Sequence, residues 1–179
     1  MADERMTLEL LESQLRQVRS WTRELIAGIP DEWLHRRVEW TDCTIAWHMG
    51  HLAWEQDVLA DAAFGIGRRL GEDWDRLFSV DSVVLEPEAY PPPERIRAAF
   101  SIALNRFLEQ LGQTEDDTVL MRRRRGGPNT LLEQVLTLIY HEGEHASSIG
   151  TLIRWFATVD NVAVPGDSAR NPATDATPV

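Results

Sequence analysis

Four long stretches of helical periodicity constrain the fold of this 179-residue chain more than any other feature. Within each stretch, apolar residues recur every three or four positions, whereas no segment alternates apolar and polar residues as a half-buried strand does. The stretches cover residues 6–28, 43–64, 93–112 and 130–157. They predict an all-α protein in which four helices bury their apolar faces together as a four-helix bundle, with a long connection between the second and third helices.

Polar residues that cap helices mark where two of these helices begin. Thr41 and Asp42 precede the second helix, and both are favourable N-cap residues. The sequence Thr130-Leu-Leu-Glu133 opens the fourth helix as a capping box. The irregular stretch 65–90 contains one short helical pattern at residues 73–78. We therefore expect one short helix within the long connection.

The helical stretches define a single domain, residues 1–158, because a chain of this length can bury a sizeable core in one unit. Residues 159–179 show no periodicity and are predicted to form a disordered tail that adds nothing to the core. The N-terminal sequence MADERM is charged, and no apolar run is long enough to span a membrane. These features predict a cytoplasmic protein with no membrane partner.

The chain is acidic, with a formal net charge of −11 and an isoelectric point near 4.9. This balance argues against a surface that binds nucleic acid, which requires clustered positive charge. Arg122 to Arg125 form one basic run. We interpret that run as a solvated loop, with a grip on a phosphate or carboxylate as the alternative.

Two single residues allow narrower predictions. The lone Cys43 cannot form an intramolecular disulfide, and we interpret it as an inert, buried thiol. Gly143 lies inside the fourth helical stretch, where glycine costs about 1 kcal/mol relative to alanine. We therefore expect another helix to pack closely against Gly143.

Histidine is the residue type that points most directly to chemistry. Four of the five histidines form pairs on two helices, His48 with His51 and His141 with His145. Because a helix turns about 100° per residue, each pair lies on a polar stripe along an otherwise apolar helix. The two stripes are Thr44, His48, His51 and Glu55, and Gln134, Thr137, His141, His145 and Ser148. Such buried groups are costly unless they are paired or bind a ligand, so we predict a site for a divalent transition metal such as zinc or nickel.

The pentapeptide from His141 to His145 also satisfies the H-E-x-x-H signature of zinc proteases. Glu142, which would be the catalytic base, lies about 100° around the helix from His141 and off the polar stripe. No histidine or glutamate follows His145 to supply a third ligand. A di-iron site needs a second E-x-x-H unit, and the other copy, Glu32 to His35, lies in the turn after the first helix. We therefore predict that the chain is not a protease, and we favour a histidine site over a di-iron site.

Two segments resemble the DinB-like superfamily of metal-binding helical proteins. The run CTIAWHMGHLAWEQDVLADAAFG is similar to that family's second helix, and HEGEHASSIG is similar to its final histidine pair. The order of the segments and the long link between the second and third helices also fit, so the resemblance covers residues 5–157. It implies a four-helix bundle of the DinB-like type that binds a divalent metal.

Carried over position by position, the resemblance implies that His51, His141 and His145 are the metal ligands. His48, one turn before His51, competes with it as the ligand from the second helix. The family's usual Arg-Gly-Gln after the last ligand is replaced here by Ala146-Ser147-Ser148. This departure puts in question any substrate contact that the Arg or Gln makes in the family.

The resemblance also implies a class of reaction, because the family includes metal-dependent transferases that act on low-molecular-weight thiols. In that interpretation the partner is a small-molecule substrate, and Glu55 or Glu144 orients a ligand or acts as a base. The alternative is a non-catalytic bundle that binds a metal or another ligand in its core, with His48 as a fourth ligand. A homodimer is compatible with either function.

Overall fold

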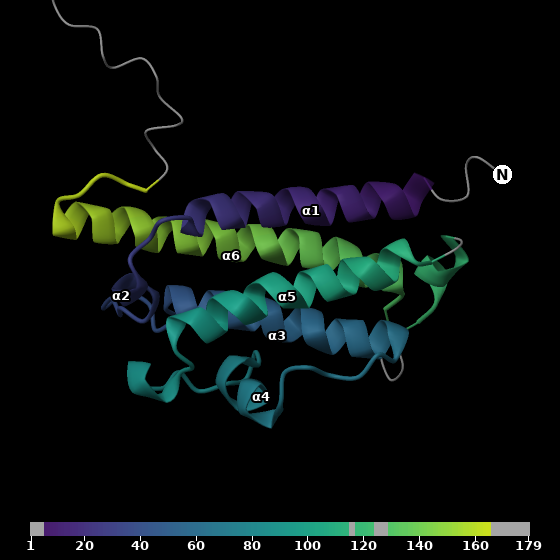
Figure 1. The fold of residues 1–179 in the computed structure, drawn as a ribbon, viewed down its shortest axis with the longest axis horizontal. Coiled ribbons are helices and arrows are strands. Elements are labelled where there is room, and N and C mark those ends of the chain that lie inside the picture. The colour runs from purple at the N-terminus through teal and green to yellow at the C-terminus, as the bar shows by residue number, and fades with distance from the viewer. Residues whose placement is uncertain (1–5, 115–116, 124–128, 166–179) are drawn as a thin grey trace, which may run out of the picture.

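The computed structural model describes residues 6–114, 117–123 and 129–165, and these residues form an all-α protein (Figure 1). Four helices are long: α1 (Met6–Ile26), α3 (Ile45–Phe64), α5 (Pro93–Gly112) and α6 (Leu131–Asp160). The shorter elements are α2 (Asp31–Leu34), α4 (Glu72–Phe78) and two 3-10 helices, Pro87–Ala89 and Asp117–Met121. The described residues contain no β-strand, and none of their helices has the length and apolar character needed to cross a membrane.

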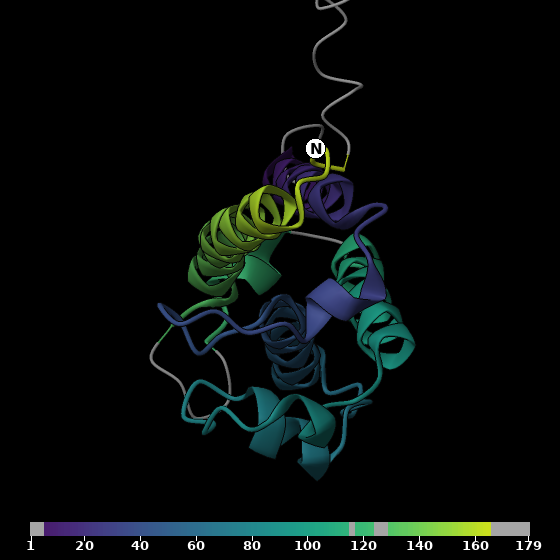
Figure 2. The same ribbon diagram turned by 90° about the vertical axis from the view of Figure 1, so that its left-hand side faces the viewer.

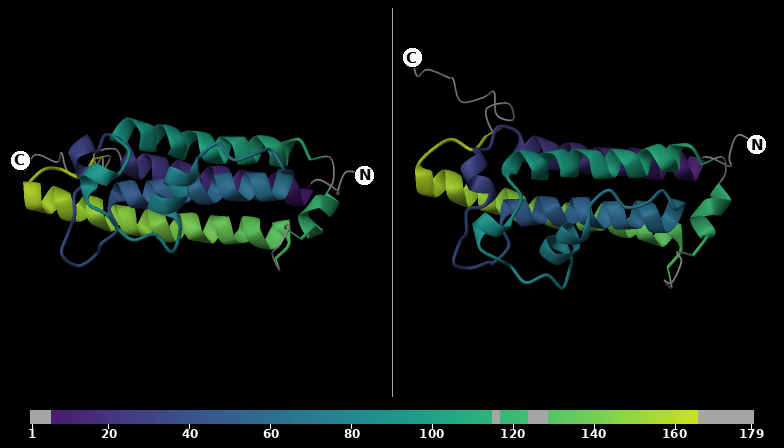
Figure 3. Two further views of the ribbon diagram at one scale, coloured as in Figure 1. Left: turned by 90° about the horizontal axis from the view of Figure 1, so that it is seen from below. Right: turned by 60° about the horizontal axis from the view of Figure 1, so that its bottom comes forward.

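The four long helices lie side by side. Helix α6 packs against α1 and α3, while α5 packs against α3 and α1, so each long helix has two long neighbours (Figures 1 and 2). Helices α3 and α5 run in the same direction. The connection from the end of α3 to the start of α5 must therefore run back along the length of α3. This connection contains α4, which packs on the outer side of α3 (Figure 3).

The helix limits agree with the sequence prediction most closely where a side chain caps the helix. The predicted capping box of α6 is confirmed, because the Thr130 side chain accepts from the Glu133 N–H while Glu133 accepts from the Thr130 N–H. Helix α3 begins at Ile45, two residues later than predicted, because Thr44 is its N-cap and accepts from the Trp47 N–H. The Thr41 hydroxyl accepts from the Cys43 N–H instead.

The core consists of two apolar clusters separated by a polar layer. One cluster gathers side chains from α2, α4, the first halves of α3 and α5 and the end of α6; the other gathers the first part of α1, the ends of α3 and α5 and the start of α6. Three buried polar side chains, Arg19, Gln56 and Glu142, lie between them. Arg19 donates to both Glu142 carboxylate oxygens at 2.8–2.9 Å, and Gln56 donates to the same carboxylate at 3.3 Å. This polar layer joins α1, α3 and α6 between the two apolar clusters.

The end of the chain differs in part from the prediction. Helix α6 continues through residues 159 and 160, and Asp160 accepts hydrogen bonds from Trp33 and Arg36. Val164 is partly buried against the first apolar cluster. The prediction that residues 159–179 add nothing to the core is therefore wrong for Val164. The remainder of the predicted tail, 166–179, lies outside the described residues, as does the basic run beyond Arg123.

The prediction of close packing at Gly143 is also wrong. Gly143 is exposed, and a Cβ added there meets no heavy atom within 4 Å. The closely packed helical glycine is Gly50, where an added Cβ would overlap the buried ring of Phe78. Helix α4 can therefore approach α3 because position 50 has no side chain.

Alanine substitutions at these two glycines should have opposite effects on stability. We expect Gly50→Ala to lower the free energy of unfolding by about 1–3 kcal/mol, because the Phe78 ring must move. The matched variant Gly143→Ala should raise it by about 0.5–1 kcal/mol through helix propensity alone. Urea denaturation of both variants measures the difference, and a stabilised Gly50→Ala protein would show that α4 does not pack as described.

Candidate metal centre

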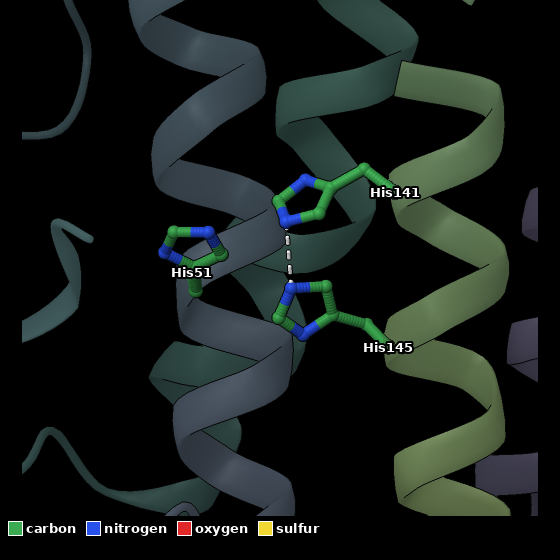
Figure 4. A group of neighbouring side chains, drawn as sticks. All are labelled: His51, His141 and His145. Carbon is green, nitrogen blue, oxygen red and sulfur yellow. Dashed lines mark hydrogen bonds between the residues drawn. The ribbon is translucent and has the colours of Figure 1, made fainter. Parts of the chain in front are cut away.

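Three histidines from two helices come together where α3 packs against α6 (Figure 4). His51 projects from α3, and His141 and His145 project from successive turns of α6. One ring nitrogen from each histidine lies within 4.8 Å of the other two. The Nε2 atoms of His141 and His145 are 2.8 Å apart. The predicted residues therefore form a single cluster, because α3 and α6 pack together along the polar stripes.

The second ring nitrogen of each histidine has its own partner. His51 Nδ1 lies 2.6 Å from the carbonyl oxygen of Phe78, and His141 Nδ1 lies 2.5 Å from Glu55 Oε2. A carbonyl and a carboxylate only accept, so both Nδ1 atoms carry the proton and both Nε2 atoms keep a lone pair. His145 Nδ1 lies 2.7 Å from His48 Nδ1. When His145 donates there, its Nε2 also has a free lone pair.

His48 therefore lies behind the cluster. Its ring contacts the side of His145 that faces away from His141. In this position it can fix the orientation and the tautomer of His145, as hydrogen-bond partners of metal-ligating histidines commonly do. Trp47 supports the same region, because its ring stacks on His51 at a centroid distance of 4.8 Å.

Burial and mutual proximity make most of these imidazoles poor bases. Burial, together with the neighbouring histidines, lowers the pKa of His145 to about 2 and that of His48 to about 4. Burial also lowers the pKa of His51. The pKa of His141 is raised, because its hydrogen bond to Glu55 stabilises the protonated ring. His48, His51 and His145 are therefore neutral near pH 7, the state in which histidine binds a metal.

The lowered pKa values predict how the metal-free protein responds to acid. Below the ordinary histidine pKa of 6.5, the unfolded chain binds protons that folded His48 and His145 do not. The stability that these two groups contribute is therefore fully present above pH 6.5 and falls as the pH drops, by about 1.4 kcal/mol per pH unit for each proton. His141 has a raised pKa, so its contribution is lost only as the pH rises above 6.5 and does not change the slope below that pH. We expect urea midpoints to fall between pH 7 and pH 5, and to fall less steeply in His48→Gln; equal slopes in both proteins would contradict this assignment.

The donor set fits a divalent transition metal. Two imidazole nitrogens, each about 2.0–2.1 Å from an ion, are about 2.9 Å apart at the right angle of an octahedral shell and about 3.3 Å apart at the tetrahedral angle. The observed 2.8 Å between His141 Nε2 and His145 Nε2 is closer to the octahedral value. Neutral imidazoles suit zinc, nickel, copper and iron, whereas magnesium and calcium prefer oxygen ligands. Three protein ligands also leave further coordination positions available.

A cavity of about 400 Å³ adjoins the cluster. His51, Glu55 and His141 form its polar end. The remaining wall is mostly apolar and includes Trp54, Val58, Leu59, Val80 and Leu138. The arrangement can therefore hold a small molecule directly beside the histidines.

Two glutamates of the HEGEH segment lie outside this arrangement. Glu142 is buried in its ion pair with Arg19, on a different face of α6 from the histidine stripe, as its position on the helix predicted. Glu144 is exposed and accepts a hydrogen bond from Tyr140. Neither glutamate lines the cavity, whereas Glu55 does.

Sequence reasoning missed three partners around the site: Arg19, His48 as the partner of His145, and the carbonyl of Phe78. A signal for Arg19 was present, because it falls four residues after Leu15 on the inward stripe of α1. The Phe78 carbonyl left no such signal, because it is a main-chain atom brought in by the packing of α4.

Comparison with known families adds one finding. Over residues 14–149 the sequence matches the family model of the DinB superfamily. That range contains all three histidines of the cluster, and also Glu55 and His48. No curated protein matches the chain.

Proposed function

Because this chain belongs to the DinB superfamily, we propose that it is a divalent-metal-dependent enzyme that acts on a small molecule, with a low-molecular-weight thiol as the expected substrate. The same membership supports interpreting the four long helices as a bundle of the DinB type. Among the described residues, the histidine cluster and its adjoining cavity are the features that support this function.

In this proposal His51, His141 and His145 hold the metal through Nε2. A divalent ion bound by three neutral ligands keeps its positive charge and lowers the pKa of a thiol that binds to it. Glu55 keeps the Nδ1 proton of His141 in place and bears a negative charge at the polar end of the cavity. Trp54 and Val58 also line the cavity.

One observation supports this function most strongly. Each of the three histidines has a separate partner on Nδ1, so all three Nε2 atoms can be directed to one point. Histidines that only stabilise a core need partners for both nitrogens, and His141 and His145 have only each other at Nε2. A metal ion satisfies those lone pairs.

A second candidate function is a non-catalytic bundle in which the metal acts as a structural staple. It requires a fourth protein ligand, for which the sequence offers His48, but His48 contacts His145 on the nitrogen that faces away from the cluster. The cavity beside His51 and His141 favours the enzyme, since a structural site needs no space for a substrate.

The test is a thiol-transfer assay with protein loaded with zinc or nickel. Cysteine is mixed with 1-chloro-2,4-dinitrobenzene, so that a carbon–sulfur bond forms, chloride leaves and the thiol proton passes to solvent. The enzyme proposal predicts conjugation that requires the metal and is lost in His145→Ala. Stoichiometric metal binding without thiol transfer, for this and a panel of other electrophiles, would support the structural staple instead.

A further inference from the structure

The cavity beside the histidines extends along α6 to a glutamine. Gln134 lines its far end and His141 its near end, on the same face of the helix. They are seven positions apart in the sequence, which corresponds to about 10.5 Å along the helix axis. The cavity therefore presents the histidine cluster at one end and a neutral amide at the other.

Gln134 has an unmet hydrogen-bonding requirement. Its side-chain oxygen is buried, and no donor among the described residues reaches it. An unpaired buried acceptor is unfavourable, and most such atoms in proteins have a partner. The residue as a whole is only partly buried, so its flexible side chain can turn toward a molecule in the cavity.

The wall between the two ends offers no competing polar group. Val58, Leu59 and Leu138 line it, and Val80 of the long connection, itself largely exposed, adds a further apolar side chain. A ligand that reaches from the histidines to Gln134 must therefore have an apolar middle section. Its far end must carry a donor, because the unpaired atom of Gln134 is an acceptor.

We propose that Gln134 determines substrate specificity by accepting a hydrogen bond from an N–H or O–H group of the substrate. This inference rests on the function proposed above. An extended chain covers about 1.2 Å per bond, so the donor lies about eight to nine bonds from the metal-binding atom. The substrate class is a thiol with an apolar spacer of that length and a terminal amide, amine or hydroxyl donor.

The test uses cobalt(II)-loaded protein, in which a bound thiolate produces a charge-transfer absorption. Three probes are titrated: 7-mercaptoheptanamide, with a donor eight bonds from sulfur; methyl 7-mercaptoheptanoate, which lacks the donor; and 3-mercaptopropanamide, which is too short. We expect the long amide to bind about tenfold more tightly than the ester, as one hydrogen bond to a buried acceptor implies. The short amide should show no such advantage.

Variants at position 134 assign the preference to this side chain. Gln134→Leu should remove the difference between the long amide and the ester, whereas Gln134→Glu, which retains an acceptor, should preserve it. Gln14→Leu, at an exposed position on α1, is the matched control and should behave as the wild type does. A preference that persists in a folded Gln134→Leu protein would overturn the assignment.

The result also separates this inference from the proposed function. If the long amide and the ester bind equally well in the wild type, the role of Gln134 is wrong, while thiol binding at the metal stands. If cobalt binds and no thiol produces the absorption, the thiol function is wrong and the specificity inference falls with it.

Discussion

Replacing Arg19 by alanine should lower the free energy of unfolding by about 3–5 kcal/mol. Arg19 and Glu142 are almost completely buried, and the guanidinium donates to both carboxylate oxygens. The same guanidinium donates to the carbonyl oxygen of Phe100 and lies 3.7 Å above its ring centroid. Alanine removes these interactions and leaves the Glu142 charge in the core, where Gln56 is its remaining side-chain hydrogen-bond partner among the described residues.

Urea denaturation measures this loss of stability. Two further variants show whether the loss is due to the buried Arg19–Glu142 pair. Arg16→Ala removes an exposed pair with Glu12 and should change stability by less than about 0.5 kcal/mol. The double variant Arg19→Met with Glu142→Leu removes both charges and should recover most of the loss. An Arg19→Ala protein as stable as Arg16→Ala would show that the buried pair does not form.

Replacing His141 or His145 by alanine should abolish stoichiometric metal binding. Each histidine supplies one of the three nitrogen donors of the cluster. Its loss should therefore lower the metal affinity by more than the 10–100-fold that is typical when a hydrogen-bond partner of a ligand is removed. His48→Ala should keep one metal ion per chain, with an affinity about tenfold lower, because His48 orients His145 without completing the cluster.

Competition with a chromogenic chelator measures these affinities for wild type and variants side by side. His35→Ala is the matched control, since His35 lies beyond α2 and stacks on Tyr90, outside the cluster. It should bind metal as the wild type does. Loss of metal from His48→Ala together with retention by His51→Ala would show that the ligand from α3 is His48, one turn earlier than His51.

The sequence predicted the long helices well, because their signals are local. Apolar periodicity and the Thr130–Glu133 capping box depend on residues within the same helix. Helix α2 was missed because its four residues are too few for a period to show. The start of α3 was placed two residues early because Thr41 and Asp42 have the same capping chemistry as Thr44, and only the fold decides which side chain caps.

For the candidate site, angular positions on a helix predicted which residues share a face but not what faces them. They put His48 and His51 on one polar stripe, put His141 and His145 on another and turned Glu142 away, whereas the choice of His51 as the ligand came from the family resemblance. They did not reveal that Arg19 would meet Glu142, because that contact joins residues 123 positions apart. Gly143 was misjudged for the same reason, since a helical period cannot tell whether a neighbour approaches.

The most direct test of the metal centre is elemental analysis combined with X-ray absorption on wild-type protein that has been loaded with zinc and dialysed. The structure predicts one zinc ion per chain, bound by three imidazole nitrogens at about 2.0–2.1 Å, with further light-atom ligands from solvent. Less than about a tenth of an ion per chain, or a shell without imidazole, would contradict the three-histidine centre.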